Sequence, residues 1–168
     1  MKGKSIALYL LIMLNTVPTY AGPEEANIAQ TKGDYATMLR ELRPLPEQGY
    51  ANAQNRLGAM YYTGQGVPQD YAQALLWYSK AAKQGDANAQ TNVGLAYYNG
   101  RGVPKDYAHA IAWFRKAGEQ GHAQAQENLG LMYANGWGVQ QDDIQAASWF
   151  RKAAEQGRDR AQNRMALT

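Results

Sequence analysis

Apolar residues recur with the spacing of an amphipathic helix in residues 86–121 of this 168-residue chain. Ala89, Val93 and Tyr97 fall at i, i+4 and i+8, which places them on one face of an α-helix. A second stripe with helical spacing occupies the other half of the stretch. It consists of Tyr107, Ala110, Trp113, Phe114 and Ala117. The pattern therefore predicts two amphipathic helices in succession.

A glycine turn separates the two predicted helices. Gly100 and Gly102 permit positive φ, and Pro104 fixes φ and lacks an amide donor, so neither helix continues through this segment. Asp106 stands at the N-cap of the second helix, where its carboxylate can accept hydrogen bonds from the free amides of the first turn. Gly121 suits the left-handed position just past the end of that helix. The stretch is therefore one helix–turn–helix unit.

The sequence contains three copies of this unit. Residues 50–85 match residues 86–121 at 20 positions, and residues 122–157 match them at 21 positions. A fixed period of this kind is typical of stacked repeats, in which each unit buries its apolar face against the next. The function is therefore expected in a surface that several copies make together.

Each copy carries a glycine inside its first helix, at Gly58, Gly94 and Gly130. Such a glycine costs about 1 kcal/mol relative to alanine, so we expect a compensating close approach of the facing helix. The missing Cβ leaves room for a large side chain there. The second helices supply aromatic pairs for this purpose: Trp77 with Tyr78, Trp113 with Phe114, and Trp149 with Phe150.

These recurring residues resemble the Sel1-like repeat, a relative of the tetratricopeptide repeat. The shared positions read A-x-A-Q-x-x-[LV]-G-x-x-Y-x-x-G-x-G-V-x-x-D-x-x-x-A-x-x-W-[FY]-x-K-A-x-x-Q-G. The resemblance implies an all-α fold, an α/α solenoid in which the repeats build a right-handed superhelix with a concave inner face. It also implies a role as an adaptor or binding platform. Relatives include immunity proteins against toxins and a cysteine-rich subgroup linked to β-lactam binding.

The internal alignment divides the chain into six parts. The first is a signal peptide, and an N-terminal capping helix pair like a tetratricopeptide repeat follows it. Three Sel1-like repeats come next, and a partial repeat then forms a C-terminal capping helix. The predicted boundaries are 1–21, 22–49, 50–85, 86–121, 122–157 and 158–168.

The first 21 residues have the layout of a signal peptide. Lys2 and Lys4 give a positive start, an apolar run follows, and Ala21 is a small residue suited to cleavage. The apolar run is short for a membrane span of roughly 20 residues. We therefore expect a periplasmic or secreted protein without a membrane span in the mature chain, and a retained N-terminal anchor is the alternative. The chain has no cysteine, so it contains no disulfide.

Removal of this segment changes the charge balance. Of the 17 basic residues, Lys2 and Lys4 leave, so 15 remain against 14 acidic residues and the mature net charge is +1. A protein that reads a nucleic-acid backbone presents a concentrated basic face. We therefore expect a protein or peptide partner and no nucleic acid.

The sequence offers no convincing catalytic or metal-binding group. His109 and His122 occupy positions that vary among the repeats, so we expect both on the solvated surface. Asp142 aligns with the predicted N-caps, which makes capping its expected role. Ser148 does not begin an S-x-x-K motif, because Arg151 stands in the lysine position. The sequence therefore predicts no catalytic residue, cofactor or metal ligand. A β-lactam or peptidoglycan-related hydrolase is an alternative function, but the chain has no residues that match one.

One side of the first helices should line the concave face and bind a partner. An amide-rich surface with a few apolar contacts suits a peptide or protein better than a buried small ligand. Trp137 is a candidate exposed anchor in its turn, although packing against a neighbouring turn is an equal alternative. The predicted face could also be merely solvated. Its residues are Asn52, Asn55, Tyr62, Asn88, Thr91, Leu95, Tyr98, Gln124, Glu127 and Leu131.

The sequence thus predicts a non-enzymatic solenoid that mediates protein–protein interaction in the bacterial envelope or outside the cell. A periplasmic immunity protein that neutralises a toxin is the main alternative. Both roles rest on the same preformed surface, so the sequence leaves the choice between them open.

Overall fold

The computed structural model describes the backbone of residues 51–165 and the side chains of residues 51–157. The described part consists of six α-helices and contains no strand. The predicted signal peptide and N-terminal capping pair lie outside the described residues. The helices are α4 (Ala51–Thr63), α5 (Tyr71–Lys83), α6 (Ala87–Asn99), α7 (Tyr107–Glu119), α8 (Ala123–Asn135) and α9 (Asp143–Met165).

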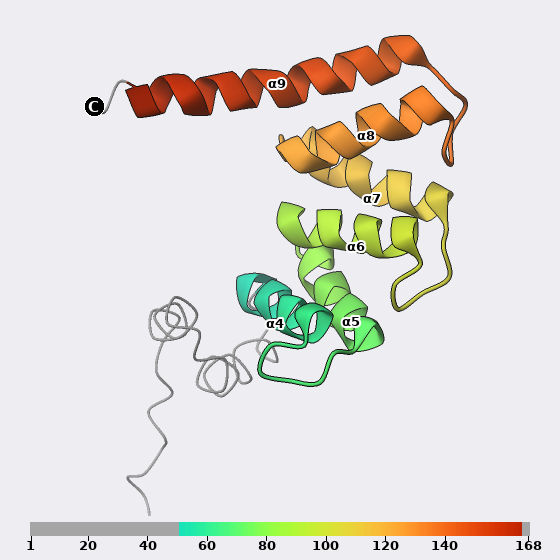
Figure 1. The fold of residues 1–168 in the computed structure, drawn as a ribbon, viewed down its shortest axis with the longest axis vertical. Coiled ribbons are helices and arrows are strands. Elements are labelled where there is room, and N and C mark those ends of the chain that lie inside the picture. The colour runs from blue at the N-terminus through green and yellow to red at the C-terminus, as the bar shows by residue number, and fades with distance from the viewer. Residues whose placement is uncertain (1–50, 166–168) are drawn as a thin grey trace, which may run out of the picture.

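The helices form three antiparallel pairs that stack in chain order (Figure 1). Each first helix packs on the second helix of its own repeat, so α4 pairs with α5, α6 with α7, and α8 with α9. Each second helix then packs on the first helix of the following repeat, α5 on α6 and α7 on α8. This arrangement confirms the predicted all-α solenoid, in which every repeat buries its apolar face against its neighbours.

The turns have the predicted backbone. Gly100 and Gly102 adopt φ of 72° and 76°, in the left-handed region that favours glycine. A Cβ on Gly102 would lie 2.3 Å from the carbonyl oxygen of Tyr71 in the preceding repeat, so the second glycine is also required by a close approach. Asp106 caps α7, because its carboxylate accepts from the backbone N–H of His109 at 2.9 Å.

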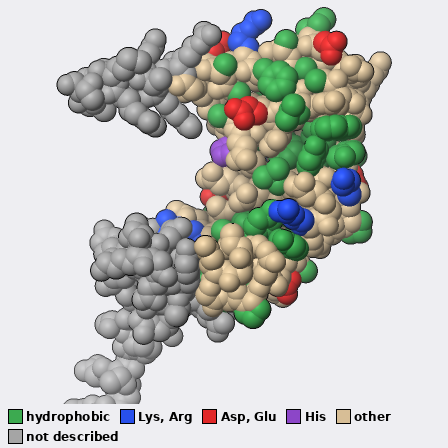
Figure 2. Space-filling view, in the orientation of Figure 1, with side chains coloured by type: hydrophobic (Ala, Val, Ile, Leu, Met, Phe, Trp, Pro, Cys, Tyr) green, Lys and Arg blue, Asp and Glu red, His purple; other side chains and the backbone are tan. Residues whose placement is uncertain are grey.

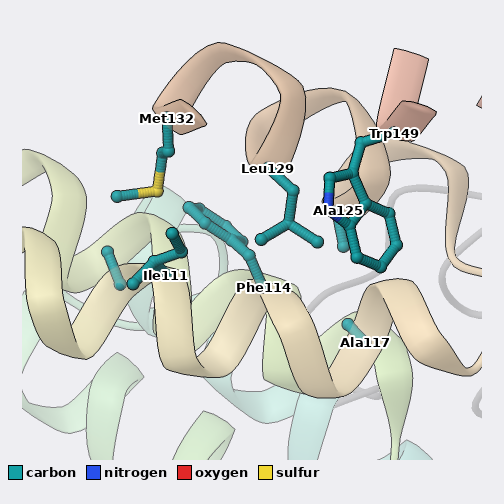
Figure 3. Packing of buried hydrophobic residues seen from close by; sticks show 8 residues of the cluster. Ile111, Phe114, Ala117, Ala125, Leu129, Met132 and Trp149 are labelled. Atoms are coloured by element: carbon teal, nitrogen blue, oxygen red, sulfur yellow. The ribbon is translucent and has the colours of Figure 1, made fainter. Parts of the chain in front are cut away.

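One cluster of the core lies between α7, α8 and α9, where the second repeat packs on the third (Figure 3). Ile111 and Phe114 of α7 point toward Leu129 and Met132 of α8, and Trp149 of α9 closes the cluster. Phe114 and Leu129 are fully buried. The expectation that an aromatic side chain fills the space at each first-helix glycine is confirmed, and the second member of each pair does so. These side chains are Tyr78 at Gly58, Phe114 at Gly94, and Phe150 at Gly130.

A buried glutamine in α6 and another in α8 each tie one repeat to the preceding one. Gln90 donates from Nε2 to the carbonyl oxygen of Ala82, in the last turn of the second helix of the preceding repeat. Its own Oε1 accepts from Gln120 Nε2 at 2.7 Å. Gln126 makes the same two bonds, to Gly118 and from Gln156. These side chains satisfy backbone and amide groups in the interior, which stabilises one orientation of each repeat on the next.

The C-terminal part departs from the predicted boundary. The alignment placed a turn at Gly157 and a separate capping helix over residues 158–168, but α9 continues without a break to Met165. Gly157 is not among the glycines with positive φ, whereas Gly85 and Gly121 at the same repeat position have φ of 93° and 87°. Arg158 stands where Asp86 caps α6, and arginine cannot accept a capping hydrogen bond.

Candidate functional site

We call the exposed sides of the first helices α4, α6 and α8 the inner face. Asn52, Asn88, Gln124 and Glu127 are exposed on it, and the side chain of Leu131 is 46% exposed. The other members that lie on it are half-buried. They are Asn55, Tyr62, Leu95 and Tyr98.

Thr91 does not belong to the inner face, contrary to the prediction. Its side chain is 1% exposed, and its hydroxyl donates to the carbonyl oxygen of Ala87 at 2.8 Å. The same oxygen lies 2.9 Å from Nδ1 of His122, which precedes the next first helix. The helical spacing placed Thr91 beside Asn88, but it could not show that this side of α6 adjoins the next repeat. A partner therefore cannot reach Thr91 in this arrangement.

The repeat position of Thr91 lies at the junction between successive first helices. At the preceding junction, Asn55 occupies it and accepts a hydrogen bond from Asn92 Nδ2 at 3.0 Å. At the last copy, Glu127 occupies it and is exposed, because no further first helix packs on α8 within the described part of the chain. The same sequence position is thus an internal contact in two copies and open surface in the third.

The two histidines have different environments. His122 is half-buried, with Nδ1 near Thr91 and Nε2 3.0 Å from Asn88 Oδ1, so the expectation that it is a solvated surface residue is wrong. His109 is exposed, as expected, and its ring lies against Tyr97. The backbone N–H of His109 donates to the carboxylate of Asp106, and the imidazole of His109 makes a second hydrogen bond to it. Both bonds lower the pKa of the Asp106 carboxyl group, and the backbone bond has the larger effect. Both histidines therefore make local structural contacts.

Aromatic side chains run along the edge of the inner face where the turns lie. Tyr62 and Tyr71 meet edge to face, with ring centroids 5.3 Å apart. The guanidinium of Arg101, from the turn of the next repeat, lies over both rings at 5.3 and 5.5 Å and donates to the hydroxyl of Tyr62. This is a cation–π contact between one repeat and the next. Figure 2 shows hydrophobic side chains gathered on the side of the turns, with basic side chains among them.

Trp137 takes the place of Arg101 in the following turn. Its ring stacks on Tyr107, with centroids 5.7 Å apart and an interplanar angle of 15°, and lies 5.6 Å from Tyr98. The indole is half-buried. Of the two interpretations left open by the sequence, the structure shows packing against the neighbouring repeat. An aromatic stack thus replaces the cation–π contact at the next junction.

The described residues assemble no group with obvious catalytic chemistry. No three His, Asp or Glu side chains among them converge as metal ligands. Asp142 accepts from the backbone N–H of Gln145, which is the capping role expected of it. Ser148 lies exposed on α9. No helix in the described part has both the length and the apolar character needed to cross a membrane.

Comparison with known proteins identifies the repeat. The family model for the Sel1 repeat matches residues 51–86, 87–122 and 123–157. No curated protein matches the chain. Among solved structures, c5321, described as a protective antigen present in uropathogenic Escherichia coli strains, is 46% identical with a TM-score of 0.72. The match covers 73% of this chain and 26% of c5321.

Two further structures share the fold. A Sel1 repeat protein from Oxalobacter formigenes is 40% identical with a TM-score of 0.75, and the match covers 79% of this chain and 54% of that one. Cysteine rich protein B from Helicobacter pylori is 24% identical with a TM-score of 0.56, covering 71% of this chain and 89% of that one. The chain therefore spans about a quarter of c5321 and about half of the Oxalobacter protein.

Proposed function

Because this chain belongs to the Sel1 repeat family, whose members are generally non-catalytic scaffolds for protein interaction, we propose that it binds a partner protein through the inner face. The partner contacts the exposed amides of Asn52, Asn88 and Gln124, the carboxylate of Glu127, and the apolar side chain of Leu131. The half-buried members Asn55, Tyr62, Leu95 and Tyr98 shape the floor of this surface. Thr91 has no part in it.

Exposure of Leu131 is the observation that carries this proposal. Its side chain is 46% exposed in the middle of α8, between polar side chains on the same face. An exposed leucine between the polar residues Glu127 and Asn135 fits a small apolar anchor within a polar rim, the composition of many protein interfaces. The amides can donate to and accept from the backbone of a partner segment.

A rigid frame supports this surface. Gln90 and Gln126 bond across the repeat junctions, and Phe114 fills the space at Gly94. Such packing holds the exposed side chains in place before a partner arrives, so binding orders few additional groups. The scaffold therefore supplies shape and the inner face supplies specificity.

The test is affinity capture with a matched pair of variants. Leu131→Asp introduces a charge on the inner face, and Leu76→Asp introduces the same charge on α5, where Leu76 is 48% exposed. We expect the parent and Leu76→Asp to retain one protein from the envelope and medium fractions of the bacterium that encodes the chain, and Leu131→Asp to lose it. Equal retention by both variants would exclude the inner face. A single toxin held by the parent would assign the immunity role.

We also propose that the protein is exported. The charge and apolar pattern of residues 1–21 supports export, as does similarity to c5321, which is described as a protective antigen. Cell fractionation followed by mass spectrometry of the N-terminus tests this. A periplasmic or extracellular protein that begins at Gly22 is expected, whereas an intact N-terminus in the cytoplasm would contradict the proposal.

A further inference from the structure

One side of α9 is the surface on which another repeat would pack. In α7, Ile111 on the corresponding side is 5% exposed and lies in the core with α8. Arg115 on the same side of α7 donates to the hydroxyl of Tyr133 in α8. Ala147 and Arg151 occupy these two positions in α9, and both are exposed. The face that joins α7 to its neighbour is therefore uncovered in α9.

The continuity of α9 explains why this face is open. At Gly85 and Gly121 the chain turns back, and the next first helix covers the preceding second helix. Beyond Gly157 the chain continues along the axis of α9 to Met165, so residues 158–165 extend the helix instead of folding back over it. Figure 1 shows this extension beyond the stacked pairs.

The uncovered face carries one projecting apolar side chain and a shallow pocket, with a charged residue at either end. We call it the α9 outer face and define it by the residues that line a shallow pocket there. Ile144 is 82% exposed, so its side chain projects from the helix. The small side chains of Ala147 and Ser148 leave a shallow pocket beside Ile144. Figure 2 shows acidic, basic and hydrophobic side chains along α9. The lining residues are Asp143, Ile144, Ala147, Ser148 and Arg151.

We propose that the α9 outer face docks a second copy of this chain, with the two α9 helices antiparallel across a two-fold axis at Ala147. Asp143 and Arg151 lie four residues on either side of Ala147, about 6 Å along the helix in each direction. An antiparallel pair centred on Ala147 therefore brings Asp143 of each copy opposite Arg151 of the other. Such a contact is isologous, because each copy presents the same projecting side chain, pocket and pair of charges to its counterpart.

The small side chains permit the close approach that this arrangement needs. Alanine and serine near the crossing point let two helix backbones come near each other, and Ile144 of each copy then lies between Ser148 and Arg151 of the second copy. The two charge pairs fix the direction, since a parallel arrangement would place like charges side by side. This dimerisation is independent of the inner face, which lies on the first helices.

Cysteine cross-linking tests the contact at its centre. The chain contains no cysteine, so Ala147→Cys introduces a unique thiol. Two thiols at a two-fold crossing can reach the short Cα separation that a disulfide requires. We expect the full chain with Ala147→Cys to form a covalent dimer under mild oxidation. The matched control Ala112→Cys, exposed on α7, should remain largely monomeric. Equal cross-linking of the two variants would overturn the proposal.

Charge exchange tests the antiparallel register. Asp143→Arg and Arg151→Asp each place like charges opposite one another in a homodimer, and we expect each to weaken dimerisation by about tenfold in sedimentation equilibrium. An equimolar mixture of the two variants restores both opposite-charge pairs and should recover the parent affinity. Failure of the mixture to recover, or a parent chain that stays monomeric throughout the micromolar range, would overturn the proposal. Circular dichroism of each variant confirms that α9 is intact.

Discussion

A Cβ atom on Gly94 would lie 2.6 Å from the ring carbon Cδ1 of Phe114. Phe114 has no exposed surface, so the ring cannot move aside into solvent. A Cβ on Gly58 or Gly130 would approach the ring of Tyr78 or Phe150 to the same distance, although Phe150 is 39% exposed. A glycine that is unfavourable for its own helix thus sets the distance between the two helices of each repeat.

Substitution of this glycine should be destabilising despite the better helix propensity of alanine. We expect Gly94→Ala to lower the free energy of unfolding by about 1–3 kcal/mol, the usual cost of an overpacked core. Gly157→Ala is the control, because it is also helical but nothing lies within 4 Å of its added Cβ. That change should stabilise the protein by up to about 1 kcal/mol. Urea unfolding of the two variants checks the opposite signs, and equal effects would contradict the packing argument.

The two aromatic residues of a pair should differ in their contribution to stability. Phe114 is fully buried, whereas Trp113 is half-buried and has the ammonium of Lys116 4.4 Å from its ring centroid. We therefore expect Phe114→Ala to cost about 3–5 kcal/mol and Trp113→Ala to cost less, about 1–3 kcal/mol. Chemical denaturation of both variants gives the comparison. A larger loss for Trp113→Ala would show that the indole supports the stack more than its exposure indicates.

The buried Gln90 should contribute more to stability than an exposed glutamine. Gln90→Ala removes the donor to Ala82 and the acceptor for Gln120, and it leaves the carbonyl oxygen of Ala82 without this partner. We expect a loss of about 2–3 kcal/mol. Gln124→Ala, on an exposed site of α8, should change stability by less than about 0.5 kcal/mol. Thermal unfolding monitored by circular dichroism distinguishes these results, and equal midpoints would contradict the proposed tie between repeats.

Stability at alkaline pH should depend on Tyr78. Burial raises the pKa of its phenol from 10.0 to about 12. The unfolded chain releases this proton near pH 10.0 while the folded protein retains it, so the contribution to stability is complete below pH 10.0 and declines as the pH rises toward 12.

Replacement by phenylalanine removes this pH dependence. Phenylalanine already occupies the same place in the other two repeats, as Phe114 and Phe150, so Tyr78→Phe should fold normally. Between about pH 9 and about pH 11, the parent should lose about 1 kcal/mol of unfolding free energy relative to the variant. Urea titrations at the two pH values measure this difference. A constant difference across the range would mean that the phenol is not buried in the folded protein.

The repeat itself followed from the sequence because it depends on local chemistry. Positive φ at Gly100 and Gly102, and capping by Asp106, are consequences of residue type within a few positions. The period of the apolar stripe likewise predicted which sides of the helices are buried, as Val93 and Leu129 confirm.

Which residues are exposed at the candidate site depends on contacts between repeats, and the spacing of residues in the sequence does not show these contacts. Thr91 and Glu127 occupy one repeat position, yet one is buried by the next repeat and the other is exposed. Gly121 and Gly157 also share a position, but only the first turns the chain back. In both cases the outcome depends on whether another helix packs at that place. The sequence determined the repeat and its turns, and tertiary packing determined which copies present a surface, because burial is set by neighbours distant in the chain.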